Sequence, residues 1–254
     1  MRIAVCIKRV PITGGRILLT EDSRAINTQH LGFTMSPHEE CGVEEAARLI
    51  EANKGDSVVL TLGPPEAVEQ LRDAMALGID RAIHLQTDGQ EWDAEATASA
   101  LLEAIRGDEA ANGPFDIVFF GNESADSGGF QVGIRVAHAL GRPCVTGLKK
   151  VTVEGSSVRC EQEVEGGRDV YLVPLPAVLT VKEGLNLPRY PSVPGKMRAR
   201  SKPVAVSTPH RPAPRLELVK LAVPAGQGRR AESLGSGAAA APAVVDILQK
   251  AGLL

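Results

Sequence analysis

The sequence predicts an α/β chain built on a doubly wound, mainly parallel sheet, with an antiparallel β extension and a C-terminal arm. Two observations predict the sheet. Short runs of consecutive apolar residues recur along the first half of the chain, which is typical of strands covered on both faces. Segments with apolar residues at helical spacing lie between these runs, and this alternation indicates parallel strands joined by helices.

The first half of the chain supplies the parallel strands and most of the helices. Helix 37–53, for example, places Val43, Ala46 and Ile50 on one face. The predicted strands are Ile3–Ile7, Ser57–Leu62, Arg81–Leu85 and Phe115–Phe120, and the predicted helices are Pro37–Asn53, Pro65–Leu77, Ala94–Ile105 and a segment from Val132 to Leu140.

The pattern changes after about Leu148, where polar turns separate short apolar segments. Turn signals at Glu154-Gly155 and at Glu165 to Gly167 predict an antiparallel meander on the sheet edge. Its predicted strands are Lys149–Val153, Val158–Val164 and Asp169–Val173, and a further apolar strand is predicted over Pro174–Val181, followed by a Pro-rich loop.

Residues 1–202 are predicted to form one domain, which includes an exposed loop over 183–200. Residues 203–254 are predicted to form an arm, because they are rich in proline and small residues and hold too little apolar content to pack alone. The arm is expected to end in a short amphipathic helix over 243–250.

The composition disfavours several classes of protein. With 28 basic and 31 acidic residues the net charge is −3, so the chain lacks the positive excess used in nucleic-acid binding. No run approaches the roughly 20 apolar residues of a membrane-spanning helix. The four cysteines form no C-x-x-C pair, which favours a reducing cytoplasm over a disulfide framework or a zinc site.

The segment from Gly121 to Gly133 is a predicted phosphate loop between a buried strand and a helix. In open α/β sheets, the carboxyl ends of strands meet helix N-termini, whose free amides accept phosphate. The spacing matches neither a Walker A motif nor a dinucleotide fingerprint, and the loop contains Glu123 and Asp126 but no Lys or Arg. An ordinary strand-to-helix turn is the alternative.

Ser36 to Glu39 is a predicted capping box with Pro37 at the first helical position. A purely structural role is the alternative here too. Glu39 and Glu40 already occupy the positive end of the helix dipole, which favours an adenosine over a phosphate at this position.

No residue pattern indicates a catalytic triad or a metal cluster. None of the five histidines stands beside a Ser or Cys in a nucleophile elbow, so redox chemistry would need a cofactor. The carboxylates Glu44, Glu45, Glu161 and Glu163 are predicted to face solvent.

The loop from Leu185 to Pro191 carries two leucines and a tyrosine among prolines. Prolines stiffen an exposed loop, and an apolar side chain on a stiff loop suits docking to a partner. Burial of Leu185 in the core is the alternative. Basic residues follow the loop: Lys196, Arg198, Arg200 and Lys202.

Five separated segments together resemble the beta subunit of electron-transfer flavoproteins, the FixA family. The likeness covers about the first 200 residues and runs through IAVCIKRVP, SPHEECGVEEAARL, LGPPEAVEQLRDAMALGIDRAIHL, GNESADSGGFQVG and PLPAVLTVKEGLNLPRYPSVPGKMRARSKP. Agreement of five motifs in order is specific where one would not be.

The resemblance implies an adenine-nucleotide alpha hydrolase-like fold and a heterodimer with an alpha subunit that holds most of an FAD at the interface. It also implies that this chain binds AMP, a nucleotide without a redox role. The implied contacts are Cys6, Ser36, Pro37, His38, Glu39, Leu62, Gly121, Asn122, Glu123, Ser124, Ala125, Asp126, Ser127, Gly128, Gly129, Phe130, Gln131 and Val132.

By the same resemblance, Leu185 docks into dehydrogenases such as acyl-CoA dehydrogenases, the arm wraps the alpha subunit, and electrons pass on to a quinone oxidoreductase or a similar acceptor. The chain is then an electron carrier and not an enzyme. Two alternatives stay open: a bifurcating subunit whose second FAD takes a hydride from NADH, and a stand-alone nucleotide-binding protein.

Three places in the motifs depart from the family pattern, one of them Ser127-Gly128-Gly129, where a more acidic stretch is common in the family. The family usually has Asn where Ser36 stands and a Lys or Arg where Asn122 stands. A monophosphate needs several donors or a cation, so Lys8, Arg9 and Arg135 are the candidates for the missing charge. The departure leaves the choice between AMP and a second FAD open.

Overall fold

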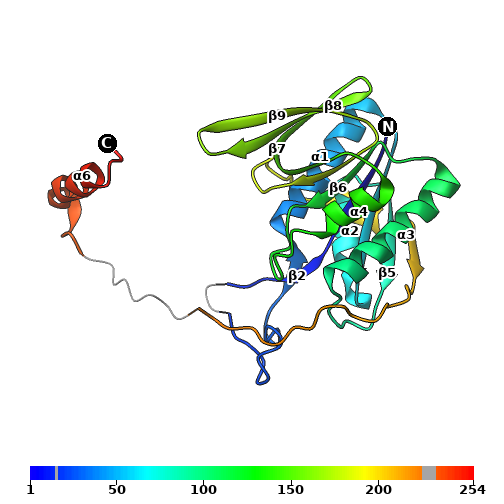
Figure 1. Cartoon of the computed structure of the whole chain (residues 1–254), viewed down its shortest axis with the longest axis horizontal. Helices are drawn as coiled ribbons and strands as arrows, with labels where there is room; N and C mark the ends of the chain where they lie inside the picture. The colour runs from blue at the N-terminus through cyan, green and yellow to red at the C-terminus, as the bar shows by residue number, and fades with distance from the viewer. Residues whose placement is uncertain (15–16, 225–232) are drawn as a thin grey trace.

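A computed structural model describes residues 1–14, 17–224 and 233–254 and contains a nine-stranded sheet in the order β11-β5-β4-β1-β6-β10-β7-β8-β9 (Figure 1). The parallel strands are β1 (Arg2–Ile7), β4 (Asp56–Gly63), β5 (Arg81–Gln86), β6 (Ile117–Gly121), β10 (Ala177–Val181) and β11 (Val204–Ser207). Their mutual pairing is parallel throughout, as predicted.

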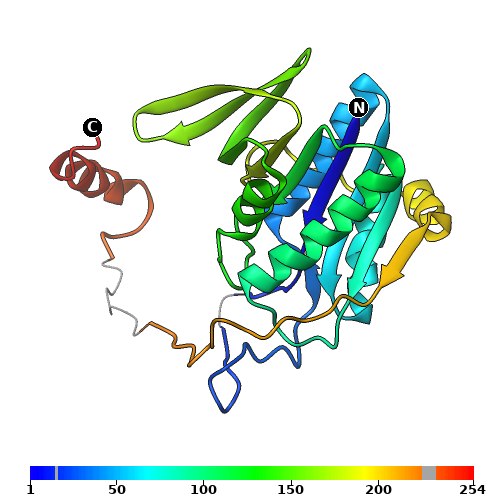
Figure 2. The same cartoon turned by 45° about the vertical axis from the view of Figure 1, so that its right-hand side comes forward.

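Helices cover both faces of this sheet, as expected of a doubly wound fold (Figure 2). Alternate residues of β1 face opposite cores: Ile3 and Val5 pack in one, Ala4 and Cys6 in the other. The first core also receives α1 (Pro37–Asn53), α2 (Val68–Ala76, preceded by the 3₁₀ turn Pro65–Ala67) and α5 (Val193–Ser201), and the second receives α3 (Ala94–Asn112) and α4 (Val132–Leu140).

The predicted meander forms one edge of the sheet. Its strands are β7 (Cys144–Glu154), β8 (Ser157–Val164) and β9 (Gly167–Pro174), paired antiparallel. β7 begins before the predicted Lys149, because Cys144 to Leu148 pair in parallel with β10 before the strand turns to β8. The predicted fold class is therefore confirmed, meander included.

Three features of the fold were not predicted: a small second sheet, helix α5 and strand β11. The long loop after β1 contains a small two-stranded sheet, β2 (Arg9–Pro11) with β3 (Phe33–Met35). The Pro-rich loop contains α5, whose N-cap Ser192 accepts a hydrogen bond from the Gly195 backbone N–H. β11 then adds to the sheet beside β5, so the sheet continues past residue 203, where the arm was expected to begin.

Beyond β11 the described part of the chain runs along the outside of the domain. Arg211 donates to Gln90 Oε1 (2.8 Å) and to the Glu91 carbonyl (2.7 Å). The terminal helix α6 (Ala241–Lys250) stands away from the sheet in both views (Figures 1 and 2). Among the described residues after 203, none is buried.

Candidate functional site

Two of the predicted motifs meet in one cavity at the carboxyl ends of the parallel strands. The N-terminus of α1 forms one wall, and the loop between β6 and α4 forms the other. The cavity has a volume of about 510 Å³ and is named here the carboxyl-edge cavity. Its lining residues are Ser36, Pro37, His38, Glu123, Ser124, Ala125, Asp126, Ser127, Gly128 and Glu183.

Helix α1 begins at Pro37, as predicted, but the predicted capping box does not form. Ser36 has the extended backbone of an N-cap, yet its side chain makes no capping hydrogen bond. Its hydroxyl instead donates across the cavity to the Glu123 carbonyl at 3.4 Å. Ser36 therefore ties the start of α1 to the β6–α4 loop.

Glu39 is buried beneath this junction. Its Oε2 accepts the backbone N–H of Lys8 at 2.6 Å, at the end of β1. Burial raises the pKa of Glu39 to about 8, against the opposing effect of the Lys8 hydrogen bond. A Cβ on Gly121 would lie 2.7 Å from Glu39 Cγ, so the close approach of strand and helix requires glycine.

Lys8 supplies the cation that the loop itself lacks. Its ammonium group lies 2.7 Å from Asp126 Oδ2 and 2.6 Å from Glu91 Oε1. Burial alone would raise the pKa of Asp126, but the charge and hydrogen bond of Lys8 lower it overall. Of the other two candidates, Arg9 stacks on Phe33 and Arg135 binds Gln131.

The β6–α4 loop closes on itself over the cavity. The Gly128 N–H donates to the Ser124 carbonyl (3.0 Å), and the Ser124 and Ser127 hydroxyls are 2.8 Å apart. Gly128 has a φ of +55°, which glycine adopts without strain. Phe130 has a φ of +53° and is 52% exposed, a conformation that a bulky side chain rarely takes.

Asn122 faces the sheet and not the cavity. Its Oδ1 accepts the Thr180 hydroxyl at 2.9 Å, and the Thr180 hydroxyl oxygen accepts the Gly147 N–H at 3.1 Å. At the far end of the loop, a Cβ on Gly133 would lie 2.9 Å from Thr180 Cγ2. Both ends of the loop are thus fixed against β10.

His38 connects the cavity to the loop over 183–200. Its Nδ1 accepts the Glu183 backbone N–H at 2.6 Å, so the neutral ring carries its proton on Nε2, which lies 3.3 Å from Glu123 Oε1. Glu183, which sequence reasoning did not assign to the site, lines the cavity through this contact.

Other predicted residues do not line the cavity. Cys6 is buried at the end of β1, where burial and the charge of Glu39 raise the pKa of its thiol. Leu62 is partly buried and packs against the second core. The loop residues outside the lining set are Gly121, Asn122, Gly129, Phe130, Gln131 and Val132.

The large apolar residues of the loop after β10 differ in exposure. Leu185 is partly buried and packs against the first core, whereas Leu187 is 85% and Tyr190 96% exposed. Glu44, predicted to face solvent, is instead buried and paired with Arg189; Glu161 is also buried and paired.

Among the described residues, no group of three or more His, Cys, Asp and Glu side chains could hold a metal ion. The described helices include none long and apolar enough to cross a membrane.

Comparisons with known proteins agree with the resemblance seen in the sequence. A family described as "Electron transfer flavoprotein domain" matches residues 24–211. The chain is 34% identical over 206 residues to the electron transfer flavoprotein subunit beta of Bacillus subtilis, covering 80% of this chain and 77% of that protein.

Two further relatives have the same subunit name. The Mycobacterium bovis protein is 36% identical over 212 residues, which are 81% of this chain and 78% of the relative. The protein of Arabidopsis thaliana, named as mitochondrial, is 34% identical over 211 residues, which are 82% of each chain.

Proposed function

The chain belongs to the electron transfer flavoprotein family, and from that membership we propose that it is the beta subunit of a heterodimer with an alpha subunit. In this proposal an FAD, held mainly by the alpha subunit at the interface, supplies the redox chemistry. This chain binds AMP in the carboxyl-edge cavity and works as an electron carrier, not as an enzyme. The compartment we propose is the cytoplasm.

The observation that carries the nucleotide assignment is the meeting of Ser36–His38 with Glu123–Gly128 around one cavity. These segments are 85 or more residues apart in sequence, and the family resemblance assigns both of them to one ligand. The cavity volume of about 510 Å³ lies within the range of roughly 300–1,000 Å³ for small-molecule sites.

The donor set fits a nucleoside more readily than a free phosphate. Carboxylates of Glu123, Asp126 and Glu183 surround the cavity, and they repel an anion. Lys8 reaches Asp126 of the loop, but Asp126 and Glu91 already share its ammonium group. A monophosphate would therefore compete with Asp126 for Lys8, while the adenosine faces His38 and the start of α1.

This competition is the reason to keep a second candidate. The second candidate is a second FAD in the same cavity, which would take a hydride from NADH in a bifurcating complex. A stand-alone nucleotide-binding protein is the third and weakest candidate, since family membership supports a subunit of a larger carrier.

The electron partners follow from the same proposal. Dehydrogenases such as acyl-CoA dehydrogenases donate electrons, with Leu185 on the loop over 183–200 as the docking residue, and a quinone oxidoreductase or similar acceptor receives them. The arm wraps the alpha subunit, which would cover the exposed apolar side chains of α6, among them Val244 and Ile247.

The test is a count of nucleotides. This chain is co-expressed with its alpha partner, the purified complex is denatured, and the released nucleotides are separated and quantified. One FAD and one AMP per heterodimer support the carrier with a structural AMP. Two FAD support the bifurcating alternative, and a stable monomer without flavin in any preparation contradicts both.

A further inference from the structure

Helix α1 is in contact with the loop after β10 along most of its length. The Asn186 amide donates to the Cys41 carbonyl (3.0 Å) and to Glu45 Oε2 (2.9 Å). Further along the helix, Arg48 Nη2 donates to the Leu187 carbonyl at 3.3 Å. The loop backbone is therefore fixed to the same helix whose first turn lines the carboxyl-edge cavity.

The strongest of these contacts joins Glu44 to Arg189. Arg189 donates to both Glu44 oxygens, from Nε at 2.9 Å and from Nη2 at 3.1 Å, and its backbone N–H also donates to Glu44 at 3.2 Å. The guanidinium group binds Glu51 as well, at 2.6 Å from Nη1. Glu44 is only 1% exposed, so its charge depends on Arg189 and Arg48 for compensation.

These contacts sort the loop side chains into two sets. The side chains of Asn186 and Arg189 contact α1. The side chains of Leu187 and Tyr190 are exposed to solvent. An exposed apolar side chain on a loop that is already ordered loses little conformational entropy on binding a partner. Large aromatic and aliphatic groups of this kind are the usual anchors of protein interfaces.

The chain segment that carries these side chains is basic. Residues 184–207 contain no Asp or Glu, and Lys196, Arg198 and Arg200 are exposed on α5. Exposed Val193 and Met197 lie on the same helix. The surface fits a protein whose apolar pocket is bordered by carboxylates.

We infer that Glu44 is a positioning residue for docking: it holds Arg189 and thereby presents Leu187 and Tyr190 to an acidic-rimmed apolar pocket on the electron-donating protein. The inference rests on the proposed function, because it assigns the docking surface of the proposed carrier. It extends docking from Leu185 to two exposed side chains and to a buried carboxylate behind them.

The experiment uses the Glu44→Gln variant of the heterodimer and two measurements. The first is the rate of tryptic cleavage after Arg189, which needs no electron partner. We expect cleavage about tenfold or more faster, as for the loss of a hydrogen-bonded charge. The second is electron acceptance from a dehydrogenase, where we expect a higher KM for the dehydrogenase with kcat and FAD content unchanged.

Two further variants make the test specific. Asp108→Asn removes another buried carboxylate paired with two arginines, on helix α3 at the other face of the sheet, and should leave both the cleavage rate and KM unchanged. Tyr190→Ala should raise KM by itself and add little in combination with Glu44→Gln. If Glu44→Gln does not fold, Arg189→Lys is used in its place, because Arg189 is the more exposed member of the ion pair.

The outcomes separate the inference from the function on which it rests. Unchanged cleavage after Arg189 in Glu44→Gln overturns the inference. A raised KM in Tyr190→Ala with a normal KM in Glu44→Gln overturns the inference and leaves the carrier function standing. A normal KM in both variants contradicts docking through this loop altogether.

Discussion

The ammonium group of Lys8 lies 2.7 Å from the carboxylate of Asp126, and this ion pair joins the end of β1 to the loop over the carboxyl-edge cavity. We expect Lys8→Met to weaken nucleotide binding by about 10- to 100-fold, because a charge-assisted hydrogen bond contributes roughly 1.5–3 kcal/mol. The measurement is the AMP or FAD content of the purified heterodimer, followed by the Kd for the released nucleotide.

Lys150→Met is the matched control for this variant. Lys150 also forms an ion pair with a carboxylate, Glu161 at 3.3 Å, but in the meander. Its removal should leave the nucleotide content unchanged. Full nucleotide content in Lys8→Met would show that Lys8 serves only to hold the loop.

Glu39 gives a pH-dependent prediction. Its pKa in the folded chain is about 8, above the ordinary value of 4.5. The stability that Glu39 contributes is therefore fully present below pH 4.5 and is lost as the pH rises toward 8. Since one pKa unit corresponds to about 1.4 kcal/mol, Glu39→Gln should gain a few kcal/mol over the natural protein between about pH 5 and about pH 9.

Thermal unfolding midpoints at several pH values test this expectation. The glutamine amide of the Glu39→Gln variant retains an acceptor for the Lys8 N–H, so the variant should fold at about pH 5. Glu66→Gln, at an exposed position before α2, serves as the control and should show no such trend. Parallel pH curves for Glu39→Gln and the natural protein would contradict the raised pKa.

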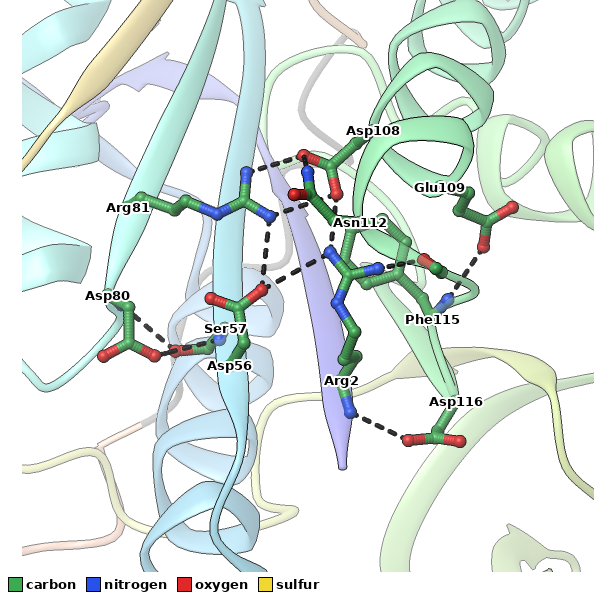
Figure 3. A network of polar contacts seen from close by, with 11 residues as sticks. Arg2, Asp56, Ser57, Asp80, Arg81, Asp108, Glu109, Asn112, Phe115 and Asp116 are labelled. Carbon is green, nitrogen blue, oxygen red and sulfur yellow. Dashed lines mark hydrogen bonds and ion pairs between the residues drawn. The ribbon is translucent and has the colours of Figure 1, made fainter.

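Asp108 is the centre of an ion-pair network at the amino ends of the strands, far from the cavity (Figure 3). It binds Arg2 at 2.7 Å and Arg81 at 2.6 Å. We expect Asp108→Ala to destabilise the protein by about 1–3 kcal/mol, less than the roughly 3–5 kcal/mol of a fully buried pair, because both arginines retain some exposure.

The same network predicts how the effect changes with pH. Burial alone would raise the pKa of Asp108, but the hydrogen bonds of Arg81 and Arg2 lower it. Its contribution is thus present above its ordinary pKa and is lost as the pH falls below that value. Denaturation at about pH 7 and about pH 3 should show a smaller cost of Asp108→Ala at the lower pH, and Arg24→Gln, from an exposed pair, should cost under about 0.5 kcal/mol at either pH.

The sequence was sufficient for the parallel strands β1, β4, β6 and β10 because each of them is buried along most of its length. β1 and β6 are continuous apolar runs, and burial on both faces is what such runs indicate. β11 could not be found this way. Only Val204 is even partly buried in it, and its identity as a strand depends on pairing with β5, more than 100 residues earlier.

The side-chain contacts of the site were also beyond reach of the local sequence pattern, because they depend on residues far apart in the chain. The spacing of Ser36 and Glu39 predicted that the Ser36 hydroxyl would accept the Glu39 N–H. That hydroxyl instead donates to the Glu123 carbonyl, and the Glu39 carboxylate accepts the Lys8 N–H. Glu44 lies in a polar stretch of sequence, and its burial is explained by Arg189, 145 residues away. Local pattern predicted two of the segments that line the carboxyl-edge cavity and could not predict which long-range contacts build it.

The last prediction concerns Leu185 and Leu187, which differ in burial although both lie on the loop after β10. Leu185 packs on the core, so Leu185→Ala should cost about 1–2 kcal/mol of stability, while Leu187→Ala should change stability by under about 0.5 kcal/mol. If both leucines contribute to docking, each variant should retain its FAD and accept electrons from a dehydrogenase more slowly. Rates equal to that of the natural protein in Leu185→Ala, with a defect in Leu187→Ala, would move the docking contact to the exposed side chain and leave Leu185 a support for the loop.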